Sequence, residues 1–370
     1  MPAPTPATPL RVAMVTPRFA PLVGGVETHV MEVSTRLAAR GVEVTVFTIA
    51  TGSEPRRQVR DGVLVRRFPA RVPGGFSWAL KAALTREAGD FEVVHVQGVH
   101  TALPVLALDA ARRAGLPTVL TFHTGGHSSR LRTALRAAQW RVLRSRLRGV
   151  DRLVAVCDYE VEYFGAATGL PAERFSMIRN GAEPLHVDAD AAPAVTGSPL
   201  VLSVGRLERY KGHHRLIATL PELLRRAPGA HLGIVGTGPY GAQLRKQADA
   251  LGVGTAVSFT SFASDQRGQL GTLLDSADVM ALLSDYEAHP VAVMEAVALG
   301  VPTLVAHGSG LTELSARGLV DGIDRDSEPE QVADALLRTA KRGRAAPPPA
   351  LPSWDDAVED LLHVYAQVTR

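Results

Sequence analysis

From residue 10 onward, short apolar runs rich in β-branched residues alternate with longer stretches in which apolar positions recur every three or four residues. The short runs predict strands, and the longer stretches predict amphipathic helices that cover them. In the first half of the chain, strands are expected at 11–17, 42–49, 62–68, 91–98, 117–123 and 151–157. Because strands and helices that alternate in this way form parallel sheets, residues 10–185 are predicted to be one doubly wound α/β domain.

The pattern is interrupted over residues 186–198, where Ala, Asp and Pro replace the apolar periodicity, as is typical of a linker. It then restarts, with strands expected at 200–205, 231–238, 256–262, 278–284 and 302–308. This predicts a second α/β domain over 199–350 and a terminal amphipathic helix within 351–370. Residues 1–9 are rich in proline and predict a disordered lead.

Composition supports a globular chain of two domains. At 370 residues the chain is longer than one hydrophobic core usually supports. The apolar fraction of 46% and the charged fraction of 21% are those of an ordinary folded protein rather than a disordered one. The single cysteine, Cys157, excludes an intramolecular disulfide and is expected to fill a small apolar site. No apolar run reaches 18 residues and no signal peptide is recognised, so a cytoplasmic protein is expected.

Charge is unevenly distributed along the chain. Residues 1–190 carry an excess of seven positive charges, whereas 191–370 carry an excess of four negative charges. Residues 130–148 hold seven arginines around Trp140 and several leucines. Such a helix either makes a peripheral contact with an anionic membrane at its inner face or has an ordinary solvated surface, and both alternatives stay open. Nucleic acid is not expected as a partner, because no recognised binding motif accompanies the charge.

Loops after the predicted strands contain the candidate chemistry, since ligands of open α/β sheets bind beyond the carboxyl ends of strands. Gly24 and Gly25 precede a helix start and can adopt positive φ, so they form either a place for close approach of an anionic ligand or a plain turn. Arg206 and Lys211 follow a strand and either converge on one diphosphate or are solvated. A second glycine turn at Gly236 follows the next strand.

Two glutamates, Glu287 and Glu295, are eight positions apart around Pro290, which is expected to be the first helical residue. Both carboxylates could accept from hydroxyl groups of a ligand in the cleft. The alternative is that Glu295 neutralises a cation in the core and that Glu287 is solvated. The residues alone leave this choice open.

Together, Arg206, Lys211, the glycine turn and the two glutamates in E-x7-E spacing closely resemble the retaining glycosyltransferases of family 4 type, group 1. The resemblance covers most of the chain and is strongest over 200–313. It implies the GT-B fold, in which two Rossmann-like doubly wound domains face each other across a cleft and the C-terminal helix crosses back to the N-terminal domain.

The resemblance also implies roles for individual residues. A nucleoside-diphosphate sugar would be the donor, with Arg206 and Lys211 on its diphosphate, Glu295 on its ribose and Glu287 on the transferred sugar. Gly25 and His123 would reach the donor from the N-terminal domain. The catalytic set it implies is His123, Arg206, Lys211 and Glu287. The donor-binding set is Gly25, Arg206, Lys211, Gly236, Glu287, His289, Val291 and Glu295.

Three further residues match the family less closely. Asn180 and Gly181 are expected to be hinge and turn residues, and Glu313 is expected to organise the site rather than touch substrate. After Glu287 this chain has Ala-His-Pro where the family commonly has Gly-Phe-Gly or Gly-Phe-Pro. The wall that faces the sugar is therefore expected to be unusual.

The expected reaction needs neither a metal nor a cofactor, because fixed cations at Arg206 and Lys211 can stabilise a leaving diphosphate. Both side chains are expected in a loop, so neither is expected to be needed for folding. The histidine-containing segments 95–100 and 123–127 lack carboxylate or cysteine ligands at zinc-like spacing. No candidate carboxylate nucleophile is evident, and the resemblance implies front-face retention, in which the acceptor hydroxyl enters on the side of the leaving group. The acceptor stays unidentified and could be lipid-linked, a glycan or a small molecule.

Other functions are compatible with the same fold. One alternative is a sugar-nucleotide epimerase or a phosphorylase-like enzyme of the GT-B type. Another is a non-catalytic protein that binds nucleotide sugars. The charged groups that the resemblance places in the cleft are Arg206, Lys211, Glu287 and Glu295. They argue against a non-catalytic binding protein, since each charge is costly to keep in a cleft without a ligand.

Overall fold

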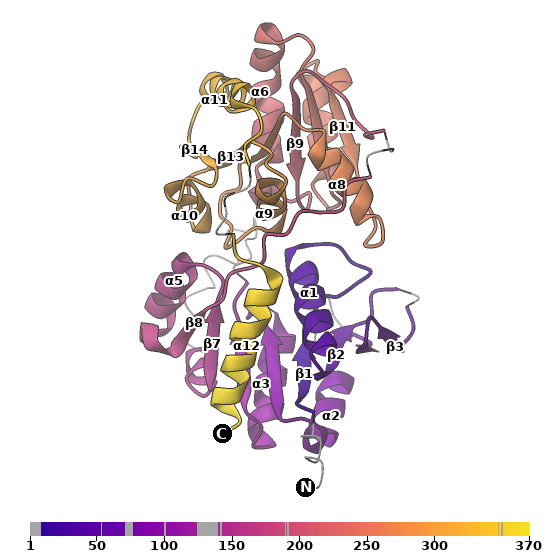
Figure 1. Ribbon diagram of the computed structural model, residues 1–370, viewed down its shortest axis with the longest axis vertical. Coiled ribbons are helices and arrows are strands. Elements are labelled where there is room, and N and C mark those ends of the chain that lie inside the picture. The colour runs from indigo at the N-terminus through magenta and orange to yellow at the C-terminus, as the bar shows by residue number, and fades with distance from the viewer. Residues whose placement is uncertain are drawn as a thin grey trace, which may run out of the picture.

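Two parallel sheets, one in each half of the chain, organise the structure (Figure 1). The computed structural model describes residues 9–370 except 53, 71–76, 100, 124–139, 141–142, 189, 191, 347 and 349–350. The N-terminal domain is the lower one in Figure 1 and the C-terminal domain the upper one. This architecture confirms the predicted α/β class with two Rossmann-like doubly wound units.

The N-terminal sheet has the strand order β3-β4-β2-β1-β5-β6-β7-β8, and among its described pairs only β3 with β4 is antiparallel. Its strands are β1 (Arg11–Val15), β2 (Glu43–Ile49), β3 (Arg57–Arg60), β4 (Val63–Phe68), β5 (Val93–Gln97), β6 (Thr118–Thr121), β7 (Arg152–Ala155) and β8 (Phe175–Met177). Its helices are α1 (Gly25–Ala39), α2 (Trp78–Arg86), α3 (Ala102–Arg113) and α5 (Asp158–Thr168).

The C-terminal sheet is parallel throughout its described pairs and has the order β11-β10-β9-β12-β13-β14. Its strands are β9 (Leu200–Val204), β10 (His231–Val235), β11 (Val257–Thr260), β12 (Val279–Leu282), β13 (Thr303–Ala306) and β14 (Asp321–Ile323). The helices after residue 200 are α6 (His213–Arg226), α7 (Gly241–Ala250), α8 (Arg267–Asp275), α9 (Val291–Ala298), α10 (Gly310–Ala316), α11 (Pro329–Arg342) and α12 (Trp354–Val368). Helix α9 begins one residue later than predicted, with Pro290 as its N-cap.

Each sheet is buried on both faces, which explains its nearly continuous apolar strands. Along β1, Ala13 and Val15 pack in one core with α2 and α3, whereas Val12 and Met14 pack in another with α1 and α12. The C-terminal sheet likewise separates a core under α6, α7 and α11 from one under α8, α9 and α10. This alternation follows from the two-residue period of a strand.

Helix α12 returns from the C-terminal domain and lies along the N-terminal domain (Figure 1). It begins with a capping box between Ser353 and Asp356. Its Tyr365 is fully buried, and the hydroxyl lies 2.6 Å from His95 Nδ1. Where the segment after β8 meets the start of α12, a Cβ on Gly181 would lie 2.5 Å from Trp354, so glycine is required there. The predicted return of the C-terminal helix is confirmed.

Within the described ranges, every helix is too short or too polar to cross a bilayer.

Candidate functional site

An ion pair between Lys211 and Glu287 lies at the carboxyl edge of the C-terminal sheet. Lys211 ends a 3₁₀ helix that follows β9, and Glu287 lies in the loop after β12, the strand beside β9. The distance from Lys211 Nζ to Glu287 Oε1 is 2.5 Å, and Ser284 Oγ donates to the same oxygen at 2.8 Å. Because neighbouring parallel strands end at one edge, side chains 76 positions apart in sequence meet here.

This ion pair is buried. Only 15% of the Lys211 side chain and 9% of the Glu287 side chain are exposed. Burial opposes the charged form of Lys211, but the Glu287 carboxylate outweighs it, and the pKa of Lys211 lies above its ordinary value. Lys211 is therefore a fixed cation at neutral pH. Lys211 lies in the loop after β9, as expected, but its side chain is buried and paired. Its loss would leave Glu287 buried without a cation, so we expect a cost to stability that the sequence did not predict.

Arg206 and Gly236 lie beside this pair. Arg206 Nη2 donates to the hydroxyl of Tyr210 at 2.9 Å, and the guanidinium is close enough to Lys211 for the two cations to repel each other. Gly236 has φ 149°, and a Cβ there would lie 2.0 Å from the carbonyl oxygen of Gly205. Only glycine allows the loops after β9 and β10 to approach so closely. The structure thus brings both predicted cations and the glycine turn together.

Glu295 is buried on α9 and pairs with Arg267, the first residue of α8. Arg267 Nη2 donates to Oε1, whereas Oε2 accepts no hydrogen bond from any described residue. Burial raises the pKa of Glu295, and Arg267 partly offsets this rise. Arg267 is the neutralising cation that one of the two alternatives from the sequence required. The second carboxylate oxygen has no hydrogen-bond partner among the described residues.

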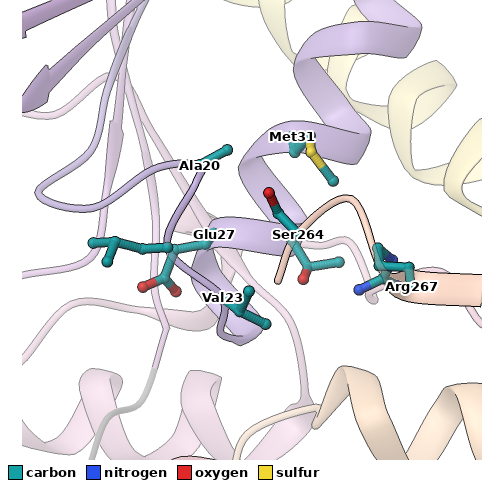
Figure 2. Close-up of a pocket in the computed structure, with 8 residues that line it drawn as sticks. Ala20, Val23, Glu27, Met31, Ser264 and Arg267 are labelled. Carbon is teal, nitrogen blue, oxygen red and sulfur yellow. The ribbon is translucent and has the colours of Figure 1, made fainter. Parts of the chain in front are cut away.

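The N-terminal wall of the site is the loop before α1 together with the first turns of that helix. Figure 2 shows this wall across a small pocket from the C-terminal domain; the labelled residues are Ala20, Val23, Glu27, Met31, Ser264 and Arg267. Gly24 has an extended φ of 168° and Gly25 begins α1, so neither uses the left-handed conformation that glycine allows. A Cβ on Gly24 would lie 2.6 Å from Glu27 Oε2, whereas one on Gly25 would meet nothing within 4 Å. Gly25 therefore leaves open space at the helix N-terminus.

His123 lies two residues after the end of β6 and contacts residues of its own domain. Its Nε2 lies 2.8 Å from Gln97 Oε1, at the end of β5. The ring of His29, on α1, is edge-on to the ring of His123, with centroids 4.7 Å apart. Both His123 and Gln97 are thus strand-end residues, as expected for side chains that reach a ligand from a rigid scaffold.

His289 and Val291 lie on either side of Pro290. Val291 packs in the core cluster that α1 and α12 share, so a ligand could meet only its backbone N–H, at the first helical position. His289 is 4% exposed, and neither ring nitrogen has a hydrogen-bond partner among the described residues. Burial, with the nearby Arg179 and Arg317, lowers the pKa of His289 to about 3. A neutral buried imidazole with unused nitrogens suits the hydroxyl groups of a ligand.

Two of the weaker family matches connect the domains. Asn180 bonds both His29 of α1 and the carbonyl oxygen of His289. Glu313, on α10, accepts from the backbone N–H groups of Asp158 at 3.1 Å and Tyr159 at 2.6 Å, at the N-terminus of α5. Both residues thus contact the opposite domain.

Several residues that shape the site were not predicted from the sequence: Glu27, His29, Gln97, Tyr210, Arg267 and Ser309. The hydroxyl of Ser309 accepts from the backbone N–H of Glu287 at 2.7 Å. Gln97 ends a strand, and Arg267 follows the loop after β11. The rule that ligands bind beyond strand ends could have indicated both. Glu27 and His29 lie inside a helix, where the sequence gives no such signal.

Residues 130–139 and 141–142 of the basic stretch lie outside the described residues.

Two Asp-x-Asp triplets occur, at 188–190 and 324–326, and are of a kind that can hold divalent cations. Within the part of the chain that the structure describes, no three His, Cys, Asp or Glu side chains form a group that could hold a metal ion.

The sequence matches two known families in succession. Residues 23–184 match the glycosyltransferase family 4, and residues 188–343 match the glycosyl transferases group 1. A D-inositol 3-phosphate glycosyltransferase from Nocardiopsis dassonvillei is 30% identical, over 98% of this chain and 96% of that protein. A glycogen synthase from Mycobacterium tuberculosis is 31% identical, over 84% and 81% respectively.

Solved structures show the same fold. A sucrose-phosphate synthase from Thermosynechococcus elongatus superposes with a TM-score of 0.77 at 19% identity, covering 97% of this chain and 98% of that chain. HepE from Anabaena, in a complex with UDP-glucose, superposes with a TM-score of 0.71 at 19% identity, covering 97% and 95%. The chain belongs to the group 1 glycosyltransferases with a family 4 N-terminal domain, and its fold is GT-B.

Proposed function

We propose that this glycosyltransferase retains anomeric configuration and moves a hexose-type sugar from a nucleoside-diphosphate sugar to an acceptor hydroxyl, without a metal ion. The observation that carries the proposal is the buried Lys211–Glu287 pair beside Arg206, at the carboxyl ends of adjacent strands. Two fixed cations there suit a diphosphate, and the open Oε2 of Glu295 suits a ribose hydroxyl.

The proposed mechanism follows from where charge develops. Cleavage of the anomeric bond builds positive charge on the sugar ring and negative charge on the departing diphosphate. Lys211 and Arg206 are charged before the reaction and are held in place, so they stabilise the transition state without reorganisation. Glu287, held by Lys211 and Ser284, would face the sugar, and His123 would reach it from the other domain.

Retention through a front-face course is part of the same proposal. No carboxylate other than Glu287 was assigned to the sugar, and Glu287 Oε1 is already engaged by two donors. We therefore expect the acceptor hydroxyl to enter on the side of the leaving group and to lose its proton to the departing diphosphate.

The donor class can be tested directly with a panel of nucleotide sugars. HepE was solved with UDP-glucose, which supports a uridine nucleotide as the first to try. A true donor at 100 times its dissociation constant should add about 2.7 kcal/mol to the free energy of unfolding. Thermal unfolding and donor hydrolysis should then select the same nucleotide sugar. If no nucleoside diphosphate or nucleotide sugar shifts the unfolding temperature, the proposed function is wrong.

Metal independence and the role of Cys157 give a further prediction. Burial raises the pKa of the Cys157 thiol, and Cys157 packs in a small apolar cluster with Val156 and Ala288. A chelator should leave kcat within about twofold, because the proposed reaction uses no metal ion. Cys157→Ser should also leave kcat within about twofold, because a buried neutral thiol is not a nucleophile. Initial rates before and after exhaustive chelation measure the first effect. Loss of activity that a divalent ion restores would overturn metal independence.

The acceptor is proposed only as a hydroxyl compound, since the relatives are named for chemically different compounds: D-inositol 3-phosphate, glycogen and sucrose phosphate. A cytoplasmic location and a peripheral contact of residues 130–148 with an anionic membrane stay predictions from the sequence.

A further inference from the structure

Three buried residues, His29, Asn180 and His289, form a polar connection between the domains. His29 Nδ1 lies 2.8 Å from Asn180 Oδ1, and Asn180 Nδ2 donates to the carbonyl oxygen of His289 at 2.7 Å. The three residues are between 2% and 4% exposed. His29 belongs to α1 of the N-terminal domain, whereas His289 is in the C-terminal loop that carries Glu287.

The direction of both hydrogen bonds is fixed by their chemistry. The His289 carbonyl can only accept, so the Asn180 amide must turn its NH₂ group toward it and its oxygen toward His29. His29 Nδ1 must then carry a proton. Burial lowers the pKa of His29 to about 4, so the ring is neutral at neutral pH and its Nε2 is bare. One tautomer and one amide orientation satisfy the connection.

His29 also contacts the predicted catalytic side chain of its own domain. Its ring is edge-on to His123, with 4.7 Å between centroids, and edge-on to Trp354, with 5.7 Å. A continuous path of contacts therefore leads from His123 through His29 and Asn180 to the backbone of the loop that holds Glu287.

We propose that Asn180 is a positioning residue that sets the loop of Glu287 and His289 against the N-terminal domain, with His29 fixing the orientation of its amide. This inference rests on the proposed function, because it assumes that the donor is gripped by both domains. Asn180 touches no substrate in this assignment. It acts by keeping His123 and Glu287, which come from different domains, at the separation that the reacting sugar requires.

Misplacement by about 1 Å can cost on the order of 100-fold in rate while binding is retained, because turnover depends on geometry more steeply than affinity does. Asn180→Ala should therefore lower kcat by about 10- to 100-fold. The affinity for the free nucleoside diphosphate should change by less than about threefold, since Arg206, Lys211 and Glu295 are untouched. Steady-state kinetics with the best donor and calorimetry with the nucleoside diphosphate measure the two quantities.

A second variant separates the connection from general packing. His29→Phe keeps an aromatic ring against His123 and Trp354 but removes the Nδ1 proton donor. It should lower kcat with the same pattern as Asn180→Ala but to a smaller extent. The double variant should be no worse than Asn180→Ala alone, because both substitutions break one connection. If Asn180→Ala does not fold, the kcat of His29→Phe still tests the positioning role.

Tyr365→Phe is the matched control. It removes a buried hydrogen bond to a histidine, His95, on the N-terminal sheet; the two ring nitrogens of His95 bond Tyr365 and Thr121, so among the described residues it shares no hydrogen bond with His29 or Asn180. It should lower the unfolding temperature and leave kcat unchanged.

The outcomes separate the two levels of the proposal. An active wild type with Asn180→Ala and His29→Phe both within twofold of its kcat would overturn the positioning role alone. Equal loss of kcat and of nucleoside-diphosphate affinity would also overturn it. A wild type that turns over no nucleotide sugar would overturn the proposed function and, with it, this inference.

Discussion

Lys211→Ala is expected to lower kcat by about 100-fold or more, which is the loss seen when one transition-state donor is removed. The same substitution is expected to lower the free energy of unfolding by about 3–5 kcal/mol, since it breaks a buried ion pair and leaves one charge uncompensated. Both effects follow from one observation, the 2.5 Å contact between Lys211 Nζ and Glu287 Oε1. Kinetics at saturating donor and chemical denaturation measure them separately.

A double variant distinguishes catalysis from stability. Lys211→Ala combined with Glu287→Gln removes both charges, so most of the lost stability should return. Its kcat should stay at or below that of Lys211→Ala, because the diphosphate still lacks its cation. Lys341→Ala, at an exposed position of α11, controls for the loss of one positive charge.

Two results would contradict the assignment of Lys211. One is a single variant with near-normal kcat on its best donor. The other is a double variant that recovers kcat together with stability, which would make Lys211 a residue of the core and not of the site.

The fold could be predicted wherever strands are buried on both faces. The runs at β1, β5 and β9 are almost wholly apolar, and their position in a parallel sheet follows from that pattern. The strands β3, β8 and β14 were not predicted. They are edge strands of three or four residues, and their sequences, such as Arg57-Gln58-Val59-Arg60, contain no apolar run. Their pairing is decided by the neighbouring strand rather than by their own sequence.

The candidate site could be predicted as a set of loops but not as a set of contacts. Strand ends placed Arg206, Lys211 and Glu287 on one edge, because the topology of a parallel sheet requires it. That Lys211 and Glu287 neutralise each other depends on the loop after β12 folding back over β9, and a pattern of residue types does not encode this distance. Arg267 was missed as the partner of Glu295 for the same reason.

Contacts between the domains were the least predictable part. Asn180 and His289 are 109 positions apart, and their hydrogen bond depends on how the two finished domains dock. The sequence of α1 does not indicate that His29 bonds Asn180. A histidine inside a helix more often lies on the surface, or packs in a core, without such a partner. Only the three-dimensional arrangement distinguishes these cases.

Glu295→Gln is expected to raise the donor's KM and to weaken binding of the free nucleoside diphosphate by about 10-fold, the usual range for losing one charge-assisted hydrogen bond. The carboxylate has Oε1 held by Arg267, and its Oε2 is left to accept from a ribose hydroxyl. That contact would exist in the ground state and persist in the transition state, so kcat should change little.

Glu287→Gln is expected to show the opposite pattern. Its side chain would face the part of the donor whose charge changes, so kcat should fall by about 100-fold. Lys211 keeps its charge in this variant, and nucleoside-diphosphate affinity should stay within about threefold of the wild type. Glu222→Gln, which disturbs an ion pair of α6 away from the site, should alter neither kinetic constant.

The pH dependence of binding separates a ribose contact at Glu295 from a purely structural one. Burial raises the pKa of Glu295 above its ordinary value, so the carboxylate gains a proton at a higher pH than a solvated glutamate does. A protonated Glu295 accepts less well from a ribose hydroxyl, and nucleoside-diphosphate affinity in the wild type should therefore weaken as the pH falls through that raised pKa. In Glu295→Gln no proton can bind there, so this part of the pH dependence should disappear. If calorimetry gives equal affinity for the wild type and Glu295→Gln at neutral pH, Glu295 serves only to pair with Arg267, and the ribose must be bound elsewhere.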